Sequence, residues 1–299
     1  MNTELIVPLL AAAIQSGTPI LYATLGEILT EKSGVLNLGV EGMMITGALA
    51  AFVTAQATGH PALAFLVAGL IGAAIGAIHA IVCLGFLGNQ VVSGLALTIF
   101  GLGLADYLGT PLIGQTAPGF NELAVPLLHA IPGLGPILFQ QDILVYGAIL
   151  TVPLLWLFLE KCRWGLNLRA VGEHPEAAAA AGISVLRYRW IGILGGGCLA
   201  GFGGAYLSLA YTHLWTNGLS AGRGWIAVAL VIFAFWRPGR ALLGAYLFGG
   251  VEIRWRCDPE IAAETPAEAD HGAEGDAIAP AAEDALAEAK AVEPNRLDL

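Results

Sequence analysis

The sequence predicts an all-α membrane protein, a polytopic bundle of about eight transmembrane helices with a disordered acidic tail. Hydrophobic residues make up 57% of the chain and charged residues only 12%, which is more apolar surface than one soluble core can bury. The lipid bilayer must therefore solvate much of this surface. Because a helical crossing needs about 20 apolar residues, the 299 residues allow several spans within one membrane domain.

Eight apolar stretches predict the membrane segments. They cover residues 5–28, 35–56, 62–83, 90–110, 142–160, 190–211, 224–236 and 240–253. No Lys or Arg precedes the first stretch, so we expect a retained helix there and not a cleavable signal peptide. The last two stretches are short, and a turn over residues 237–240 separates them, so a re-entrant or broken helical hairpin is the alternative to two crossings.

Glycine pairs predict where these helices pack most closely. Gly72 and Gly76 form one GxxxG pattern, and Gly197 and Gly201 form another. In lipid, no hydrophobic force draws helices together, so close approach of two backbones supplies the attraction. We therefore interpret these glycines as packing positions in the bundle.

Basic residues predict the orientation of the chain, because Lys and Arg are retained in cytoplasmic loops. Several lie in the segment 161–189, whereas the loop 111–141 contains none. We therefore expect 161–189 in the cytoplasm, and the loop 111–141 and the N-terminus outside. Arg223 is the exception, since this topology puts it on the outer side.

The cytoplasmic segment contains a predicted short exposed helix. Pro175 suits its first turn, Glu173 and Glu176 suit the positive end of its dipole, and Gly182 suits its end. A docking surface for a cytoplasmic partner would need such a helix, while a solvated connector between two spans is the alternative.

Two motifs give the chain a resemblance to a known family. Glu176-Ala177-Ala178, followed after three residues by Gly182, resembles the EAA-x-x-x-G signature of ABC importer permeases. The segments 34–44 and 89–97 are similar to permeases of the sugar, nucleoside and branched-chain amino acid group, with the nucleoside branch nearest. The resemblance covers about residues 1–252. Gly192 departs from the longer signature, which has Ile at that position.

The resemblance implies a function and a set of partners. It implies the permease subunit of an ABC importer in the cell inner membrane, with a second permease, nucleotide-binding ATPase subunits, an external solute-binding protein and lipid around it. The expected solutes are nucleosides first, simple sugars second and branched-chain amino acids third. It also implies a coupling surface that docks on the ATPase, formed by Glu173, Glu176, Ala177, Ala178 and Gly182.

Other classes of function find less support in the residues. The chain has no G-x-x-x-x-G-K-[ST] loop, so ATP is expected on the partner and no cofactor on this chain. Its histidines and cysteines are dispersed without metal-ligand spacing, and neither enzymatic activity nor a nucleic-acid partner is expected. A stand-alone secondary transporter or channel is the rival hypothesis, with Glu41 and Asp106 as ion sites.

Polar groups inside apolar stretches are candidates for the solute pathway, because burying them in a membrane is costly. These candidates are Asn37, Glu41, Asn89, Gln90 and Ser93. Asn37 and Glu41 are four residues apart, so one helix would place them on one face. Interhelical hydrogen bonding is the alternative role. Glu27 is expected at a solvated helix end.

The last segment differs from the rest. Residues 254–299 form an acidic tail whose composition cannot bury enough surface to order it. Beyond Glu252 there are twelve acidic and four basic residues. The permeases that this chain resembles continue with further apolar helix, so we expect the tail to be a non-native ending on a membrane domain of residues 1–253, and a non-transporting remnant is a third hypothesis.

Overall fold

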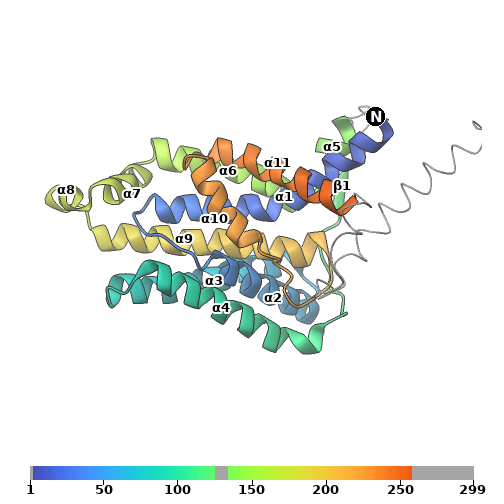
Figure 1. The fold of residues 1–299 in the computed structure, drawn as a ribbon, viewed down its shortest axis with the longest axis horizontal. Coiled ribbons are helices and arrows are strands. Elements are labelled where there is room, and N and C mark those ends of the chain that lie inside the picture. Colours follow the sequence, from blue (N-terminus) through green and yellow to red (C-terminus); the bar gives the residue numbers. More distant parts are fainter. Residues whose placement is uncertain (1–2, 125–133, 258–299) are drawn as a thin grey trace, which may run out of the picture.

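The computed structural model describes residues 3–124 and 134–257. Its long helices run the length of an elongated bundle (Figure 1). The helices are α1 Thr3–Glu31, α2 Val40–Thr58, α3 Pro61–Ala80, α4 Gln90–Gly109, α5 Leu134–Leu138, α6 Ile143–Lys161, α7 Arg163–Glu173, α8 Pro175–Ala180, α9 Val185–Tyr206, α10 Arg223–Phe233 and α11 Pro238–Cys257. Single π-helical turns extend α3 and α9, over Ile81–Gly85 and Leu207–Tyr211, and a 3₁₀ turn, Thr110–Leu112, follows α4.

Six helices in the described ranges are long and apolar enough to cross a membrane. They are Val7–Glu31, Val40–Thr58, Pro61–Gly85, Gln90–Leu112, Ile143–Lys161 and Val185–Tyr211. The expected count of eight is therefore not confirmed. The seventh stretch forms α10, which has only 11 residues, and the eighth forms α11, which carries Arg240 near one end and Glu252 and Arg254 near the other. The pair is a hairpin of one short and one charged helix.

Glycines allow close backbone contact between α3 and α9. A Cβ atom built on Gly72 would lie 2.2 Å from the carbonyl oxygen of Gly197, and one on Gly197 would lie 2.5 Å from that of Gly72. A Cβ on Gly201 would lie 2.3 Å from the carbonyl oxygen of Ala68. Side chains larger than hydrogen therefore do not fit, and the predicted packing role of these glycines is confirmed.

The chain between α1 and α2 is not helical. The sequence predicts helix from residue 35, but α2 begins only at Val40. Residues 32–39 form turns and an extended stretch in which Val35 and Asn37 are 1% exposed. Gly34, with φ of +84°, takes a left-handed conformation that a side chain would disfavour. Buried backbone N–H and C=O groups are almost always hydrogen-bonded, so this segment needs partners.

The loop between α4 and α6 adds a small sheet to the expected all-α fold. Strands β1 Glu122–Ala124 and β2 Gln140–Asp142 pair antiparallel, with Glu122 opposite Asp142. The Asp142 carboxylate accepts hydrogen bonds from the backbone N–H groups of Leu144 (2.8 Å) and Val145 (3.1 Å), and one from the Tyr206 hydroxyl (3.1 Å). Burial raises the pKa of the Asp142 carboxyl, and these hydrogen bonds oppose the rise. These hydrogen bonds connect the loop to the start of α6 and to α9.

The expected boundary at residue 253 falls inside a helix. α11 continues to Cys257 and packs along α1. The rest of the predicted tail, residues 258–299, lies outside the described residues.

Candidate functional site

Side chains from three helices satisfy the backbone of the irregular segment 32–39. The N–H of Leu36 donates to the Gln90 side-chain oxygen at 2.8 Å, and the Leu36 carbonyl lies 3.1 Å from Nε2 of His79. Because a carbonyl only accepts, Nε2 of His79 is assigned the proton. Nδ1 of the same ring lies 3.0 Å from the Ser93 hydroxyl. The structure thus brings Gln90 and Ser93 together, around a histidine that is fully buried.

The next residues of the segment are held in the same way. The N–H of Asn37 donates to the Glu27 carboxylate at 3.0 Å, and the Thr98 hydroxyl donates to the Leu38 carbonyl at 2.9 Å. Asn37 uses its own side-chain oxygen to accept from the N–H of Gly39 at 2.9 Å. Glu27 is only 1% exposed, so its expected place at a solvated helix end is wrong. It serves as an internal acceptor for unwound backbone.

Asn37 and Glu41 do not share a helical face. Asn37 precedes the start of α2, so the spacing of four residues does not align the two side chains. The Glu41 carboxylate instead accepts hydrogen bonds from the Ser220 hydroxyl (2.5 Å) and from the N–H groups of Gly222 (2.9 Å) and Gly224 (2.6 Å). These groups surround the first residue of α10, so Glu41 caps that helix from another element.

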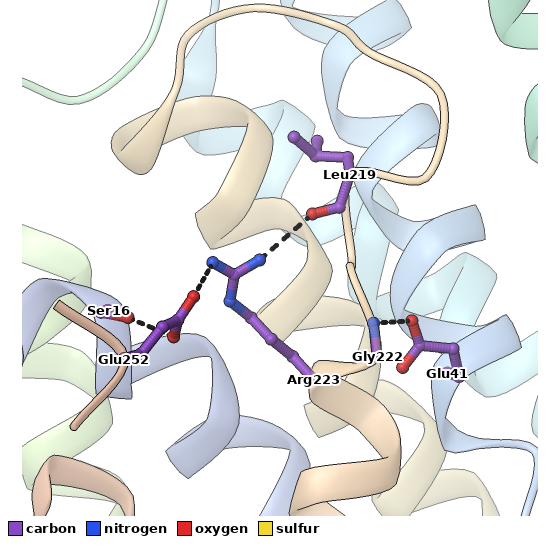
Figure 2. A network of polar contacts seen from close by, with 6 residues as sticks. All are labelled: Ser16, Glu41, Leu219, Gly222, Arg223 and Glu252. Atoms are coloured by element: carbon purple, nitrogen blue, oxygen red, sulfur yellow. Dashed lines mark hydrogen bonds and ion pairs between the residues drawn. The ribbon is translucent and has the colours of Figure 1, made fainter. Parts of the chain in front are cut away.

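An ion pair lies on the other side of the segment leading into α10, as Figure 2 shows. The guanidinium of Arg223 lies 2.7 Å from the Glu252 carboxylate, and Arg223 is 2% exposed. The second Glu252 oxygen accepts from the Ser16 hydroxyl at 2.6 Å. Arg223 is therefore buried in the bundle, where its charge is paired. Glu252, at the expected end of the domain, is bonded to both α1 and α10.

Asn89 differs from the other pathway candidates. It is exposed and caps α4, with its side-chain oxygen accepting from the N–H of Val92 at 3.2 Å. The structure therefore places it at a helix end, next to the Gln90 that reaches the irregular segment. Of the five candidates, Asn37, Gln90 and Ser93 belong to one cluster, and Glu41 to a second.

The predicted cytoplasmic helix is present as α8. Pro175 is its first residue, and it follows α7 with His174 between them. Both helices lie beyond one end of the bundle, opposite to α5 and β1 (Figure 1). Glu173, Glu176 and Ala177 are exposed, whereas Ala178 is buried. Most of the predicted coupling residues are thus available to a partner.

Gly182 ends α8 in a Schellman motif. The N–H of Ile183 donates to the Ala178 carbonyl and that of Gly182 to the Ala179 carbonyl, each at 2.9 Å. Gly182 itself has φ of +80°, and nothing lies within 4 Å of a Cβ built on it. The glycine of the EAA-x-x-x-G pattern is therefore required by backbone conformation and not by space.

α7 contacts the irregular segment directly. A Cβ atom on Gly172 would lie 2.3 Å from the carbonyl oxygen of Lys32, and one on Gly34 would lie 3.0 Å from Cα of Gly172. Two backbones touch here without intervening side chains. A displacement of α7 toward this contact would therefore displace residues 32–34 as well.

Two features escaped the sequence reasoning. His79 was not predicted as a site residue. It lies within an apolar stretch, however, which is the feature that identified the pathway candidates. Arg223 directly precedes the seventh apolar stretch and Glu252 lies within the eighth, and their opposite charges were the signal for a pair.

Comparison with known proteins adds an independent finding. Residues 9–256 match the family described as the branched-chain amino acid transport system / permease component. The chain is 46% identical to a candidate glucose ABC transporter permease of Haloferax volcanii, over 81% of this chain and 74% of the relative. It is 37% identical to a nucleoside ABC transporter permease of Lactococcus lactis (78% and 77% covered) and 34% identical to a guanosine ABC transporter permease of Bacillus subtilis (82% and 80%). No solved structure matches the chain.

Proposed function

Because the chain belongs to the branched-chain amino acid transport system / permease component family, we propose that it is the membrane-spanning subunit of an ABC importer for nucleosides. The family and the relatives support an ABC permease subunit for sugar or nucleoside import in the cell membrane. The preference for nucleosides rests on the segments 34–44 and 89–97 and on the names of two relatives. Glucose is the second candidate, because the relative with 46% identity is named for it.

The observation that supports this role best is the exposed pair α7 and α8 at one end of the bundle. A connector between spans α6 and α9 needs no such helices, whereas an ATPase subunit needs a rigid surface to move. We propose that Glu173, Glu176, Ala177, Ala178 and Gly182 form that surface. ATP is then bound and hydrolysed on the partner, and this chain performs no bond-changing chemistry.

The backbone contact at Gly172 supports a route for the motion. Displacement of α8 moves α7, and α7 presses on residues 32–34 through Gly172. Residues 35–38 lie between the backbone hydrogen bonds that end α1 and those that begin α2, and the side-chain bonds of this stretch to Gln90, Thr98 and Glu27 can exchange. A segment of this kind can take up the conformational change that the rigid helices on either side cannot.

The two internal helix starts suggest where the solute passes. α2 and α10 both begin inside the bundle, and Glu41 links the two starts. In transporters, broken helices of this kind commonly lie beside the solute, because their free N–H groups can bind it. We propose that the solute passes between the segment 32–39 and the start of α10, where Asn37, Gln90 and Ser93 offer hydrogen bonds to ribose or hexose hydroxyls.

Reconstitution tests the proposed function. The full chain is placed in vesicles with its ATPase subunits, a solute-binding protein and a second permease, and uptake of labelled guanosine, uridine and glucose is compared. We expect nucleoside uptake that requires ATP and all subunits, and competition among nucleosides.

Two outcomes would contradict the proposal in different ways. ATP-driven uptake of glucose alone would support an ABC importer whose solute is glucose and not a nucleoside. Uptake by this chain alone, driven by a proton or sodium gradient, would support the rival secondary transporter.

Changing Gly182 tests the coupling surface. Gly182→Val forces a β-branched residue into a left-handed conformation, at a cost of about 1–2 kcal/mol, and should loosen the end of the six-residue α8. We expect about a tenfold fall in uptake per ATP hydrolysed, since about 1.4 kcal/mol corresponds to a factor of ten. Uptake and ATP hydrolysis are measured together in the reconstituted vesicles.

Gly182→Asn is the matched control, because asparagine adopts the left-handed conformation readily. It should retain most of the coupling. Glu176→Lys alters the exposed face without backbone strain and should weaken retention of the ATPase during purification. Normal coupling in both Gly182→Val and Glu176→Lys would refute the role of α8.

A further inference from the structure

A basic cavity of about 850 Å³ lies between the end of α6, α7 and the turn that joins α10 to α11. It is at the end of the bundle that carries α7 and α8, the expected cytoplasmic side. Five basic residues line it, and Glu160 is the acidic residue among its lining. The basic residues are Lys32, Lys161, Arg169, Arg237 and Arg240.

The positive charge of the residues that line the cavity exceeds their negative charge. Glu160 is paired with Arg169 at 2.9 Å. In residues 3–124 and 134–257, the other four basic side chains have no ion-pair partner. The neighbouring carboxylate of Glu31 accepts a hydrogen bond from Trp236. Four like charges around one concave space favour an anion, because each raises the positive potential that the others experience.

The wall of the cavity is apolar on one side. Trp156 is 46% exposed, Phe235 65% and Leu243 66%, and all three line the cavity. Two of the cations lie over these rings, Lys161 at 6.0 Å from the Trp156 centroid and Arg240 at 5.3 Å from that of Phe235. A ligand that meets both parts of the cavity has an anionic head and an apolar body.

The backbone at the mouth of the cavity is strained. Phe235 and Trp236 both have φ of +53°, a conformation that costs bulky residues about 1–2 kcal/mol each. Such strain persists where the surrounding structure enforces it, and it is common at ligand clamps. Here it turns the chain between α10 and α11 and brings Arg237 and Arg240 to the cavity.

We propose that this cavity binds the phosphate head group of an anionic phospholipid from the cytoplasmic leaflet. The phosphate lies among Lys32, Lys161, Arg237 and Arg240, and the acyl chains lie along Trp156, Phe235 and Leu243. Basic pockets at the cytoplasmic ends of membrane helices suit such head groups. The exposed apolar wall favours a lipid over a soluble phosphate. The lipid would link α6 and α7 to the hairpin of α10 and α11.

Lipid retention by the purified full chain in detergent tests this proposal. Native mass spectrometry and melting are measured with phosphatidylglycerol, phosphatidylcholine, inorganic phosphate and glycerol 3-phosphate. We expect retention and a raised melting temperature with phosphatidylglycerol only. Arg237→Gln/Arg240→Gln should weaken that binding about 30-fold, at about 1 kcal/mol for each charge removed.

Arg163→Gln/Arg187→Gln is the matched control, since it removes two exposed charges of the same end away from the cavity. Equal losses in the two double variants, equal binding of phosphatidylcholine, or equally tight binding of inorganic phosphate or glycerol 3-phosphate would overturn the proposal. If the test variant does not fold, Arg237→Gln alone is compared, with about a fivefold loss expected. These measurements need neither ATPase nor solute, so their failure would leave the proposed importer function untouched.

Discussion

Gly72→Ala is expected to destabilise the bundle by about 3 kcal/mol or more, at the upper end of the range for overpacked cores. The added methyl carbon would lie 2.2 Å from the Gly197 carbonyl oxygen and 2.9 Å from Cα of Gly201. Both obstacles are backbone atoms of α9, so no flexible side chain can move aside and the two helices must separate. The measurement is the melting temperature of the detergent-solubilised protein, together with the yield of folded protein in membranes.

Two other glycine-to-alanine changes serve as controls for this contact. The nearest atom to a Cβ on Gly76 is the Ile193 carbonyl oxygen at 3.1 Å, so Gly76→Ala should cost less. Gly103 lies within α4 and has nothing within 4 Å of its Cβ position. Gly103→Ala should be neutral or stabilise the protein by up to about 1 kcal/mol. Equal melting of Gly72→Ala and Gly103→Ala would show that α3 and α9 are not in backbone contact.

Arg223→Met should destabilise the bundle by about 3 kcal/mol, because it removes the cationic partner of a buried ion pair with Glu252. Arg223 is 2% exposed, and the Glu252 side chain is 18% exposed. Ser16 remains a hydrogen-bond donor to Glu252 in this variant, but it carries no charge. The double variant Arg223→Met/Glu252→Leu should recover most of the loss, since apolar residues of similar size often replace such pairs without cost. Melting of the two single variants and the double variant measures the coupling energy.

The pair of Arg169 and Glu160 is the control for this cycle. Its side chains are 25% and 42% exposed, so Arg169→Met should cost less than about 1 kcal/mol. A small loss in Arg223→Met, or a double variant that melts below both single variants, would contradict a compensating buried pair.

Local features of the sequence determined the membrane class and the limits of several elements. Of the eight apolar stretches, the first six correspond to helices that can cross a bilayer, because the length of an apolar run needs no knowledge of its neighbours. α8 was predicted with its first residue, Pro175, and its end at Gly182, since the conformations of proline and of a left-handed glycine are local properties. The GxxxG patterns likewise indicated which faces pack.

The tertiary structure alone decided how the buried polar residues are used. The sequence indicated no hydrogen-bond partner for Glu41, a pathway candidate. In the structure, the N–H groups of Gly222 and Gly224 at the start of α10 donate to its carboxylate. The short final stretches pack along α1, and the ion pair of Arg223 and Glu252 links α10 to α11. The break before Val40 depends on acceptors and donors from α1, α3 and α4. Buried backbone can leave a helix only where distant side chains replace its hydrogen bonds, and no local pattern in one sequence states which distant residues will meet.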